Sequence, residues 1–370
     1  MIHRFIFFIA LLVTPSAVLQ AAEQSFPTID ATVLDREAFA EWVEGKETPI
    51  SEAKAKGGPG AVVWAATGRP DWPGVRFGEG RSDGVRHLRI GFTESVAVGS
   101  LLVRSGGALS VLKPDAAYPG NLADDSQWAA ADRLIDGEVS RLEVDGEGYA
   151  LWVLPEGTKT RALRFSHSPK PGDREMAGWL GGVWINERRL GNVAPQALVQ
   201  SVARDDASAK LVDESNNRQW QAWDNGEKGA TLPISPEHPE FVTLTWPQAV
   251  RLDGICLLWT GFADVDVETF TGAERESVRE AADSNWQRVA SNRDMDALYP
   301  MALGPHWIGF DKTTTTRALR LRIIKGAKST HSHLDDKVRE GRRVWLGELI
   351  AVASLANDAP LVSLVLPKAS

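Results

Sequence analysis

The chain has 370 residues, of which 43% are hydrophobic and 24% are charged, and its formal net charge is -8. This length exceeds one ordinary core and fits two domains, and the composition is that of a folded globular protein. An acidic chain without a long Lys/Arg cluster lacks the basic face that DNA or RNA binding requires, so we expect no nucleic-acid partner.

The first 22 residues predict a secretory signal. A basic pair, His3 and Arg4, precedes a nearly unbroken apolar run at 5–13, and small residues follow up to Ala22. This order is typical of an export signal, and the run is too short to span a bilayer comfortably. We expect cleavage near Ala22, with retention as an N-terminal anchor as the alternative. No later segment is apolar enough to cross a membrane, so a secreted, periplasmic or extracellular location is expected.

An amphipathic pattern follows the signal and predicts one short N-terminal helix at about 34–44. Asp35 can cap its start and Gly45 can end it. The residues at helical spacing that form its apolar face are Leu34, Ala38, Phe39, Trp42 and Val43.

The rest of the chain contains a duplication. The pentad Thr-Arg-Ala-Leu-Arg occurs at 160–164 and again at 316–320. Three further anchors keep the same order, pairing 92–103 with 246–257, 126–128 with 284–286, and 183–187 with 344–348. The period of about 155 residues is that of a whole domain and not of a solenoid repeat. We therefore predict a first domain at 23–195, a second at 200–357 and a C-terminal tail at 358–370.

Both copies are predicted to be β-rich. Runs such as 87–92, 242–246 and 318–323 alternate apolar and polar residues or are rich in β-branched ones, and Gly, Pro, Asn and Asp separate them. Many short strands in a domain of this size favour a sandwich or jelly roll, in which alternate side chains fill the space between two sheets.

The second copy resembles the discoidin domain (coagulation factor 5/8 type C). The residues that carry this resemblance are 209–213, Asn216, Asn217, Trp220, 257–258, 265–267, 285–286, 317–322 and 346–349. The first copy matches mainly through the second. The resemblance implies two tandem galactose-binding-like jelly-roll sandwiches. It also implies modules that are usually non-catalytic and that recognise glycans, lipids or proteins through loops at one end of the barrel.

The chain is unusually rich in tryptophan, with fourteen residues. Tryptophan stacks on sugar rings and anchors interfaces, but it also fills cores between sheets. Four lie at matched positions and are assigned to the core: Trp128, Trp184, Trp286 and Trp345. Four others lie in polar, turn-rich context and are the candidates for binding a neutral or basic glycan: Trp72, Trp220, Trp223 and Trp307. Trp220 has a framework role as its alternative.

The resemblance also implies a structural calcium ion in the second domain only. Discoidin-like modules that bind sugar often hold calcium between the opening Asp loop and the closing Glu, and calcium accepts six to eight oxygen ligands in irregular geometry. The matching residues here are Asp213, Asn216, Asn217 and Glu348. The alternative is an Asx-type turn without a metal. The first copy has Glu187 but no Asp-Asn turn, so we expect no calcium there.

Familiar catalytic motifs do not occur in the sequence, which has no phosphate loop, zinc-protease motif or nucleophile elbow. His331 and His333, with carboxylates close by, fit a solvated loop better than a metal site. The single cysteine, Cys256, lies in an apolar run and is predicted to be a buried small hydrophobe. We therefore expect an exported, non-catalytic binding protein for surface carbohydrate or polysaccharide, with no required cofactor. The alternatives are a structural or scaffolding protein that binds a surface protein, and an enzyme with an unrecognised site.

Overall fold

The computed structural model describes residues 31–50, 55–58, 61–64, 75–78, 84–135, 138–140, 149–168, 178–213, 223–226, 228–273, 276–295, 305–326 and 340–355. The expected signal at 1–22 and the tail at 358–370 lie outside these ranges. Within them the regular structure consists of β-strands and short 3-10 helices, which confirms the predicted all-β class. No helix in this part of the chain is long and apolar enough to span a bilayer.

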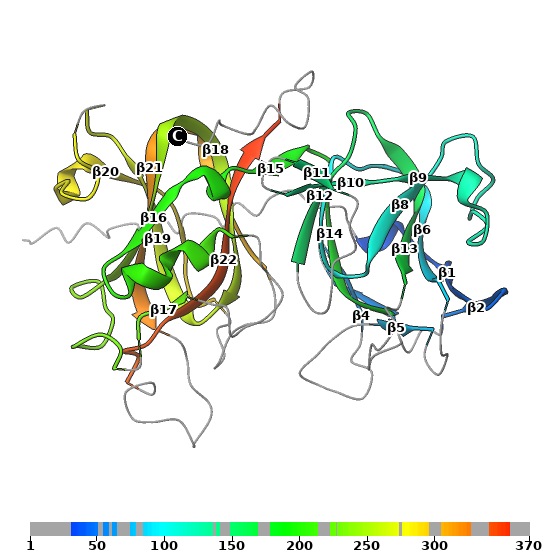
Figure 1. Cartoon of the computed structure of the whole chain (residues 1–370), viewed down its shortest axis with the longest axis horizontal. Coiled ribbons are helices and arrows are strands. Elements are labelled where there is room, and N and C mark those ends of the chain that lie inside the picture. Colours follow the sequence, from blue (N-terminus) through cyan, green and yellow to red (C-terminus); the bar gives the residue numbers. More distant parts are fainter. Residues whose placement is uncertain are drawn as a thin grey trace, which may run out of the picture.

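The first half of the chain is a sandwich of two sheets (Figure 1). Its elements are η1 (Ala31–Val33), β1 (Leu34–Val43), β2 (Lys46–Pro49), β3 (Ala55–Gly58), β4 (Ala61–Trp64), β5 (Val75–Phe77), β6 (Arg86–Ala97), β7 (Ser100–Ser105), β8 (Ala108–Leu112), η3 (Asp125–Gln127), β9 (Trp128–Ala130), β10 (Asp132–Ile135), β11 (Glu138–Ser140), β12 (Tyr149–Val153), β13 (Lys159–His167) and β14 (Gly178–Asn186). One sheet has the order β2-β1-β6-β13-β8-β9 and the other the order β11-β10-β12-β7-β14-β4-β3, with β5 beside β14. Leu88 and Ile90 of the first sheet meet Leu101 and Val103 of the second in one buried cluster, so the core lies between the sheets.

The second half repeats this arrangement with longer strands. Its elements are β15 (Leu190–Asn192), η4 (Ala194–Gln196), β16 (Leu198–Ser201), η5 (Asp205–Leu211), β17 (Trp223–Asp224), β18 (Glu240–Thr260), β19 (Phe262–Phe270), η7 (Asp283–Asn285), β20 (Trp286–Asn292), β21 (His306–Gly326) and β22 (Trp345–Ser354). The start of β18 pairs with the end of β21, and its end pairs with β22 and the start of β21. Register shifts separate the two parts, so β18 and β21 each contribute to both layers.

The two halves have the same order of strand pairing. In the first half β13 lies between β6 and β8, and β7 lies between β12 and β14. In the second half β21 lies between β18 and β19, and β18 lies between β21 and β22. Strands β6 and β7 therefore correspond to β18, β12 and β13 to β21, and β14 to β22. Strands β1 and β16 also correspond, because β1 pairs with β6 and β16 pairs with the start of β18.

The predicted helix at 34–44 is wrong, because Leu34–Val43 forms strand β1. The register of β1 against β6 shifts between Asp35 and Ala40, and this bulge interrupts the alternation of buried and exposed side chains. Ala38, Phe39 and Ala40 are consecutively buried. A bulged strand thus imitates helical spacing, and pairing in the sheet overrides local propensity.

One predicted repeat anchor is out of register. Trp184 pairs with Leu102, whereas the residue opposite the equivalent Cys256 is Ile350. The structural match to 345–347 is therefore 179–181, which has the same sequence, Trp-Leu-Gly. By the same register Gly182, and not Glu187, occupies the position that corresponds to Glu348.

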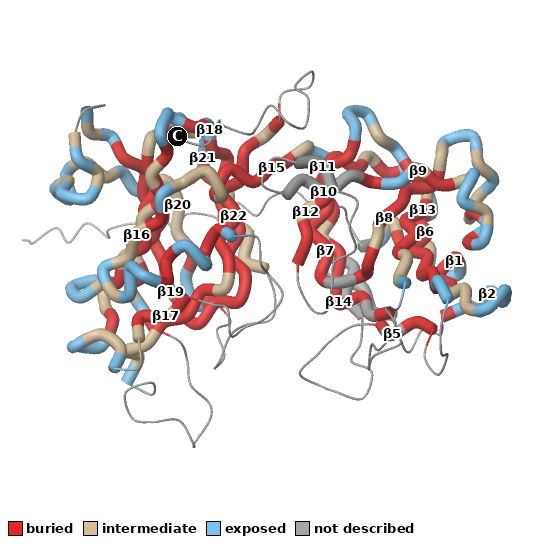
Figure 2. Tube along the Cα trace, viewed as in Figure 1, coloured by how far each residue is buried: buried red, intermediate tan, exposed pale blue. Residues whose placement is uncertain are grey.

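The two halves pack together through equivalent sheet faces. Leu102 and Tyr149 of the first half share a buried cluster with Cys256, Leu258 and Trp259 of the second. Burial of the Cys256 thiol raises its pKa well above the ordinary value, which confirms the predicted small hydrophobe. Figure 2 shows the buried strands on both sides of this contact. Strand β15 pairs with β22, so the sheet of the second half already includes residues before 195.

Of the tryptophans assigned to the core, two are buried and two are only partly buried. Trp128 and Trp345 are 5% and 6% exposed, whereas Trp184 and Trp286 have intermediate exposure. Trp184 packs against the cluster between the halves, and Trp286 lies edge-on to Phe270. The core assignment is therefore confirmed for Trp128 and Trp345.

Candidate functional site

The structure separates the tryptophans that were predicted to bind a ligand. Trp223 is fully buried, and its indole Nε1 donates a hydrogen bond to Ser201 Oγ at 3.1 Å. The prediction that Trp223 binds a ligand is wrong, because pairing of β17 with β22 directs the indole into the core. Trp307 lies on β21 and packs against the cluster between the halves. Trp72 and Trp220 lie outside the described residues, each a short distance before β5 or β17.

The predicted calcium ligands are only partly placed. Asp213 is exposed, and Glu348 is buried on β22 opposite Leu258. Asn216 and Asn217, like the pair His331 and His333, fall outside the described ranges. Among the residues that the structure places, no group of three or more His, Cys, Asp or Glu side chains is arranged to hold a metal ion. The calcium site stays a prediction.

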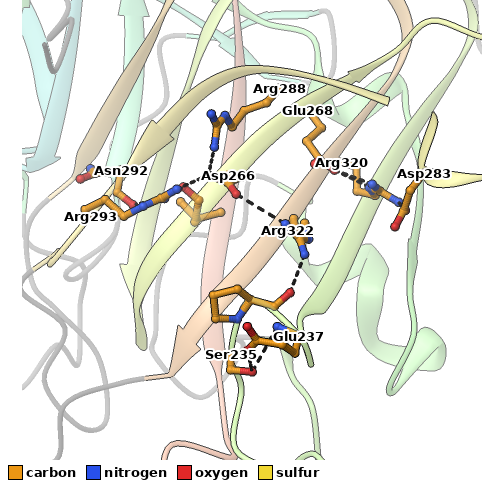
Figure 3. A network of polar contacts seen from close by, with 12 residues as sticks. Ser235, Glu237, Asp266, Glu268, Asp283, Arg288, Asn292, Arg293, Arg320 and Arg322 are labelled. Atoms are coloured by element: carbon orange, nitrogen blue, oxygen red, sulfur yellow. Dashed lines mark hydrogen bonds and ion pairs between the residues drawn. The ribbon is translucent and has the colours of Figure 1, made fainter. Parts of the chain in front are cut away.

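A polar cluster covers the outer side of one layer in the second half (Figure 3). Val265 and Val267 of β19 point into the core, so Asp266 and Glu268 point outward. Leu321 of β21 is likewise a core residue, which places its neighbours on the outer face. We call this cluster the arginine face and define it by Asp266, Glu268, Arg288, Arg293, Arg320 and Arg322.

Three arginines surround the carboxylate of Asp266. Arg293 Nη2 donates to Asp266 Oδ1, while Nη1 of the same guanidinium donates to the Val265 carbonyl at 2.7 Å. The Nη1 atoms of Arg288 and Arg322 lie 3.8 Å from Oδ1 and Oδ2 of Asp266. The side chain of Asp266 is only 5% exposed, against 63% for Arg288 and 29% for Arg322. The guanidinium groups, and not the carboxylate, therefore meet the solvent.

The Arg322 guanidinium has a second anchor at the edge of the cluster. Its Nη2 donates to the carbonyl of Pro236 at 2.5 Å. In the same loop the Ser235 hydroxyl donates to Glu237 at 2.9 Å, and this bond is the main cause that lowers the pKa of Glu237. The loop that accepts a hydrogen bond from Arg322 therefore also contains the Glu237 carboxylate, which is ionised and bonded to the Ser235 hydroxyl.

Arg320 belongs to a clasp that both halves share. Its Nε donates to Glu268 Oε2 at 2.7 Å and its Nη1 to Asp283 Oδ1 at 2.9 Å, and its guanidinium lies 4.5 Å from the centre of the Trp286 ring. In the first half Arg164 pairs with an aspartate and stacks on a tryptophan in the same way. Because the contact of an arginine with an aspartate and a tryptophan recurs in both halves, we assign it to the shared fold. The three arginines around Asp266 are then the feature that distinguishes the second half.

In the first half a histidine and a serine occupy the positions that correspond to Phe241 and Arg322. His87 pairs with Ser166 across β6 and β13, and its Nδ1 lies 2.7 Å from Ser166 Oγ. The Trp42 ring is 5.3 Å from the imidazole. Burial, and then the charge of Arg164, lower the pKa of His87 from 6.5 to about 4, so the ring is neutral near pH 7.

Chemically, the arginine face offers charged hydrogen-bond donors held in fixed positions beside aromatic rings. Guanidinium groups bind carboxylates, sulfates, phosphates and hydroxyl oxygens. Phe241 lies 4.6 Å from the Arg320 guanidinium and, like Trp286, is partly exposed. The alternation of β19 places Asp266 and Glu268 on one face from sequence alone. Which arginines lie opposite them depends on the strand register, so the sequence carried no signal for the cluster.

Comparison with known proteins gives no family assignment, because no protein-family model and no curated protein matches the chain. The chain is similar to the solved structure of allantoicase from Saccharomyces cerevisiae, with 10% identity, a TM-score of 0.27 and coverage of 75% of this chain and 80% of that one. It is also similar to the family 32 CBM of C. perfringens NanJ in complex with galactose, with 10% identity, a TM-score of 0.31 and coverage of 44% and 99%. A third similar structure is the F-lectin (fucolectin) from Morone saxatilis serum, with 10% identity, a TM-score of 0.29 and coverage of 82% and 97%. The matches include carbohydrate-binding structures and enzymes, among them a GH29 fucosidase, and scores this low assign no function to this chain.

Proposed function

We propose that this protein is an exported, non-catalytic carbohydrate-binding protein built from two tandem discoidin-like domains. The observation that carries the proposal is the arginine face of the second half (Figure 3). Ligands rich in hydroxyl groups require several fixed donors and acceptors beside an apolar surface. Arg288 supplies exposed donors and Arg322 partly exposed ones, Asp283 supplies an exposed acceptor, and Phe241 and Trp286 supply partly exposed rings.

Export is part of the same proposal. The basic pair, the apolar run and the small residues of the first 22 positions support it. The acidic net charge of -8 supports the absence of a nucleic-acid partner. The polysaccharide or cell-surface glycan would then be met outside the cytoplasm.

A screen of the purified protein against immobilised neutral, amino and acidic glycans tests the binding function. We expect retention of the protein by at least one class, with weaker retention for the Arg288→Gln/Arg322→Gln variant. A failure of all classes to retain the protein would contradict the proposal. The bound glycans are then incubated with the protein and assayed for new reducing ends or other products. Turnover would show that the protein is an enzyme, which is the third alternative from the sequence.

A scaffolding role is the second candidate function, and exposed apolar residues favour it. Leu198 and Val202, at the two ends of β16, are 63% and 75% exposed. Apolar side chains exposed together at one sheet edge are suited to a protein partner. Loss of a co-purifying surface protein on Leu198→Ser/Val202→Ser substitution, with glycan retention unchanged, would support this role.

A further inference from the structure

We propose that the arginine face recognises an anionic group, the carboxylate or sulfate of an acidic polysaccharide. This inference rests on the proposed function and names its ligand class. It differs from the neutral or basic glycan expected from the net charge, because net charge governs long-range approach whereas the nearest groups govern contact.

The charge balance around Asp266 supports an anionic ligand. Three guanidinium groups, those of Arg288, Arg293 and Arg322, lie within ion-pair distance of one carboxylate. The flanking carboxylates are already engaged, since Glu268 accepts from Arg320 at 2.7 Å and Glu237 accepts from the hydroxyl of Ser235. Asp266 and Glu237 counted against these three arginines leave one positive charge at this point, while the adjoining clasp of Arg320, Glu268 and Asp283 carries one negative charge.

The hydrogen bonds show which arginines are available to a ligand. Arg293 donates to Asp266 and to two backbone carbonyls, so its donors are occupied by the protein. Arg288 and Arg322 approach Asp266 only to 3.8 Å, which is beyond hydrogen-bond distance. Arg322 Nη2 also donates to the Pro236 carbonyl, so Nη1 is the donor that Arg322 offers beside Asp266. The guanidinium groups of Arg288 and Arg322 come from β20 and β21, on either side of the Asp266 carboxylate (Figure 3). An oxyanion lying above Asp266 would accept bonds from both.

Asp266 acts as a positioning residue in this arrangement. Its side chain is 5% exposed, and it draws three guanidinium groups to one place while the ligand meets their outer donors. Because a charged hydrogen bond is roughly twice as strong as a neutral one, two such donors favour carboxylate or sulfate over a hydroxyl group.

The first half carries different residues at the positions that correspond to Asp266, Arg288 and Arg322, which restricts the inference to the second half. Ala108 pairs with Ser166 where Asp266 pairs with Arg322. Ala130 lies opposite Ser110 where Arg288 lies opposite Glu268. The cluster is therefore absent from the described part of the first half and is not demanded by the shared fold.

The test uses affinity electrophoresis of the full-length mature protein in gels that contain polygalacturonate, dextran sulfate or uncharged dextran. We expect the two acidic polymers to retard the protein, and added 0.5 M salt to weaken the effect. Arg288→Gln/Arg322→Gln should lower the affinity for the acidic polymers by about tenfold or more. The control is Arg251→Gln, which removes one positive charge, where the double variant removes two, from an exposed position opposite Thr315 and should change the affinity less than twofold.

The outcomes separate this inference from the proposed function. Retardation by only one acidic polymer identifies the anion, carboxylate or sulfate, and supports the inference. Retardation by dextran alone, or equal losses for Arg251→Gln and the double variant, overturns the inference and leaves carbohydrate binding intact. No retardation in any gel, together with no retention in the glycan screen, overturns both. Unchanged thermal melting of the double variant shows that lost affinity is not lost folding.

Discussion

In the first half of the molecule Arg164 lies 5.1 Å from the Trp128 ring centre and pairs with Asp125, and in the second half Arg320 lies over Trp286 and pairs with Asp283. The pentad threonines repeat as well. The hydroxyls of Thr160 and Thr316 each lie within hydrogen-bond distance of a carbonyl of the neighbouring strand and of the carbonyl two residues ahead. The identical pentads therefore make the same contacts in the two halves.

The outer faces around these clasps differ. In the first half Arg89 donates to Gly120 O at 2.6 Å and Arg164 donates to Leu122 O at 3.1 Å, so the loop between β8 and β9 covers the sheet. In the second half the arginines around Asp266 stay partly exposed. The comparison teaches that the duplicated residues specify the framework, whereas the residues that differ are the better candidates for function.

The largest effect is expected at a core position that differs between the halves. Trp223 on β17 occupies the place of Val75 on β5, and both are fully buried. Trp223→Ala should lower the free energy of unfolding by about 3–5 kcal/mol, because it leaves a large cavity. Urea unfolding followed by circular dichroism measures this change. Val75→Ala removes fewer atoms and should cost less, and a Trp223→Ala variant as stable as the wild type would place the indole outside the core.

The shared clasp should be more sensitive in the second half. Arg320→Met leaves Glu268, whose side chain is 12% exposed, without its partner, and should cost about 3 kcal/mol. Arg164→Met leaves Asp125, which is 86% exposed and keeps its hydration, and should cost about 1 kcal/mol. Denaturant unfolding of both variants checks the order. Adding Glu268→Gln to Arg320→Met should recover part of the loss, and equal costs for the two arginines would contradict this account.

His87 should make the first half sensitive to acid. Its folded-state pKa of about 4 lies below the ordinary 6.5, so the unfolded chain binds the extra proton first. Stability is therefore present above pH 6.5 and is lost as the pH falls from 6.5 towards 4, by about 2 kcal/mol after allowance for partial solvent screening. Thermal melting across this range measures the loss. His87→Phe, which copies Phe241 of the second half, should flatten the profile, and an unchanged slope would assign the acid sensitivity to other groups.

Calcium should produce the smallest effect and only in the second half. A site with a dissociation constant of about 0.1–1 mM, common in extracellular modules, would raise stability by about 0.4–1.4 kcal/mol at 1 mM calcium. Melting curves with calcium and with chelator measure the difference, and Asp213→Asn should abolish it. Identical curves for the wild type would show that Asp213 and the neighbouring asparagines form an Asx turn without a metal.

The sequence alone was sufficient for the class of fold, and it contains the repeated pentad. Alternation in runs such as 318–323 predicts strands because side chains of a strand point to opposite faces, and the pentad is identical in both halves. Cys256 was assigned correctly because its neighbours are apolar on both sides. These properties are local, so a single segment of chain contains the information.

The errors arose where a local pattern had two explanations. Leu34–Val43 has helical spacing because a bulge shifts its register, and the bulge exists only when β6 pairs with it. Trp223 lies in a polar stretch, but its strand partner directs it into the core. Trp184 and Trp345 share flanking residues although the register joins 179–181 to 345–347.

By itself the sequence determined the all-β class, the repeated pentad and the burial of the single cysteine, since each depends on neighbours along the chain. Only the tertiary structure decided that Asp266, Arg288 and Arg322 meet on one face. These residues lie on three different strands, and a shift of one residue in either pairing would turn a side chain to the opposite face of the sheet. The physical reason is that cross-strand register depends on the packing of the whole core.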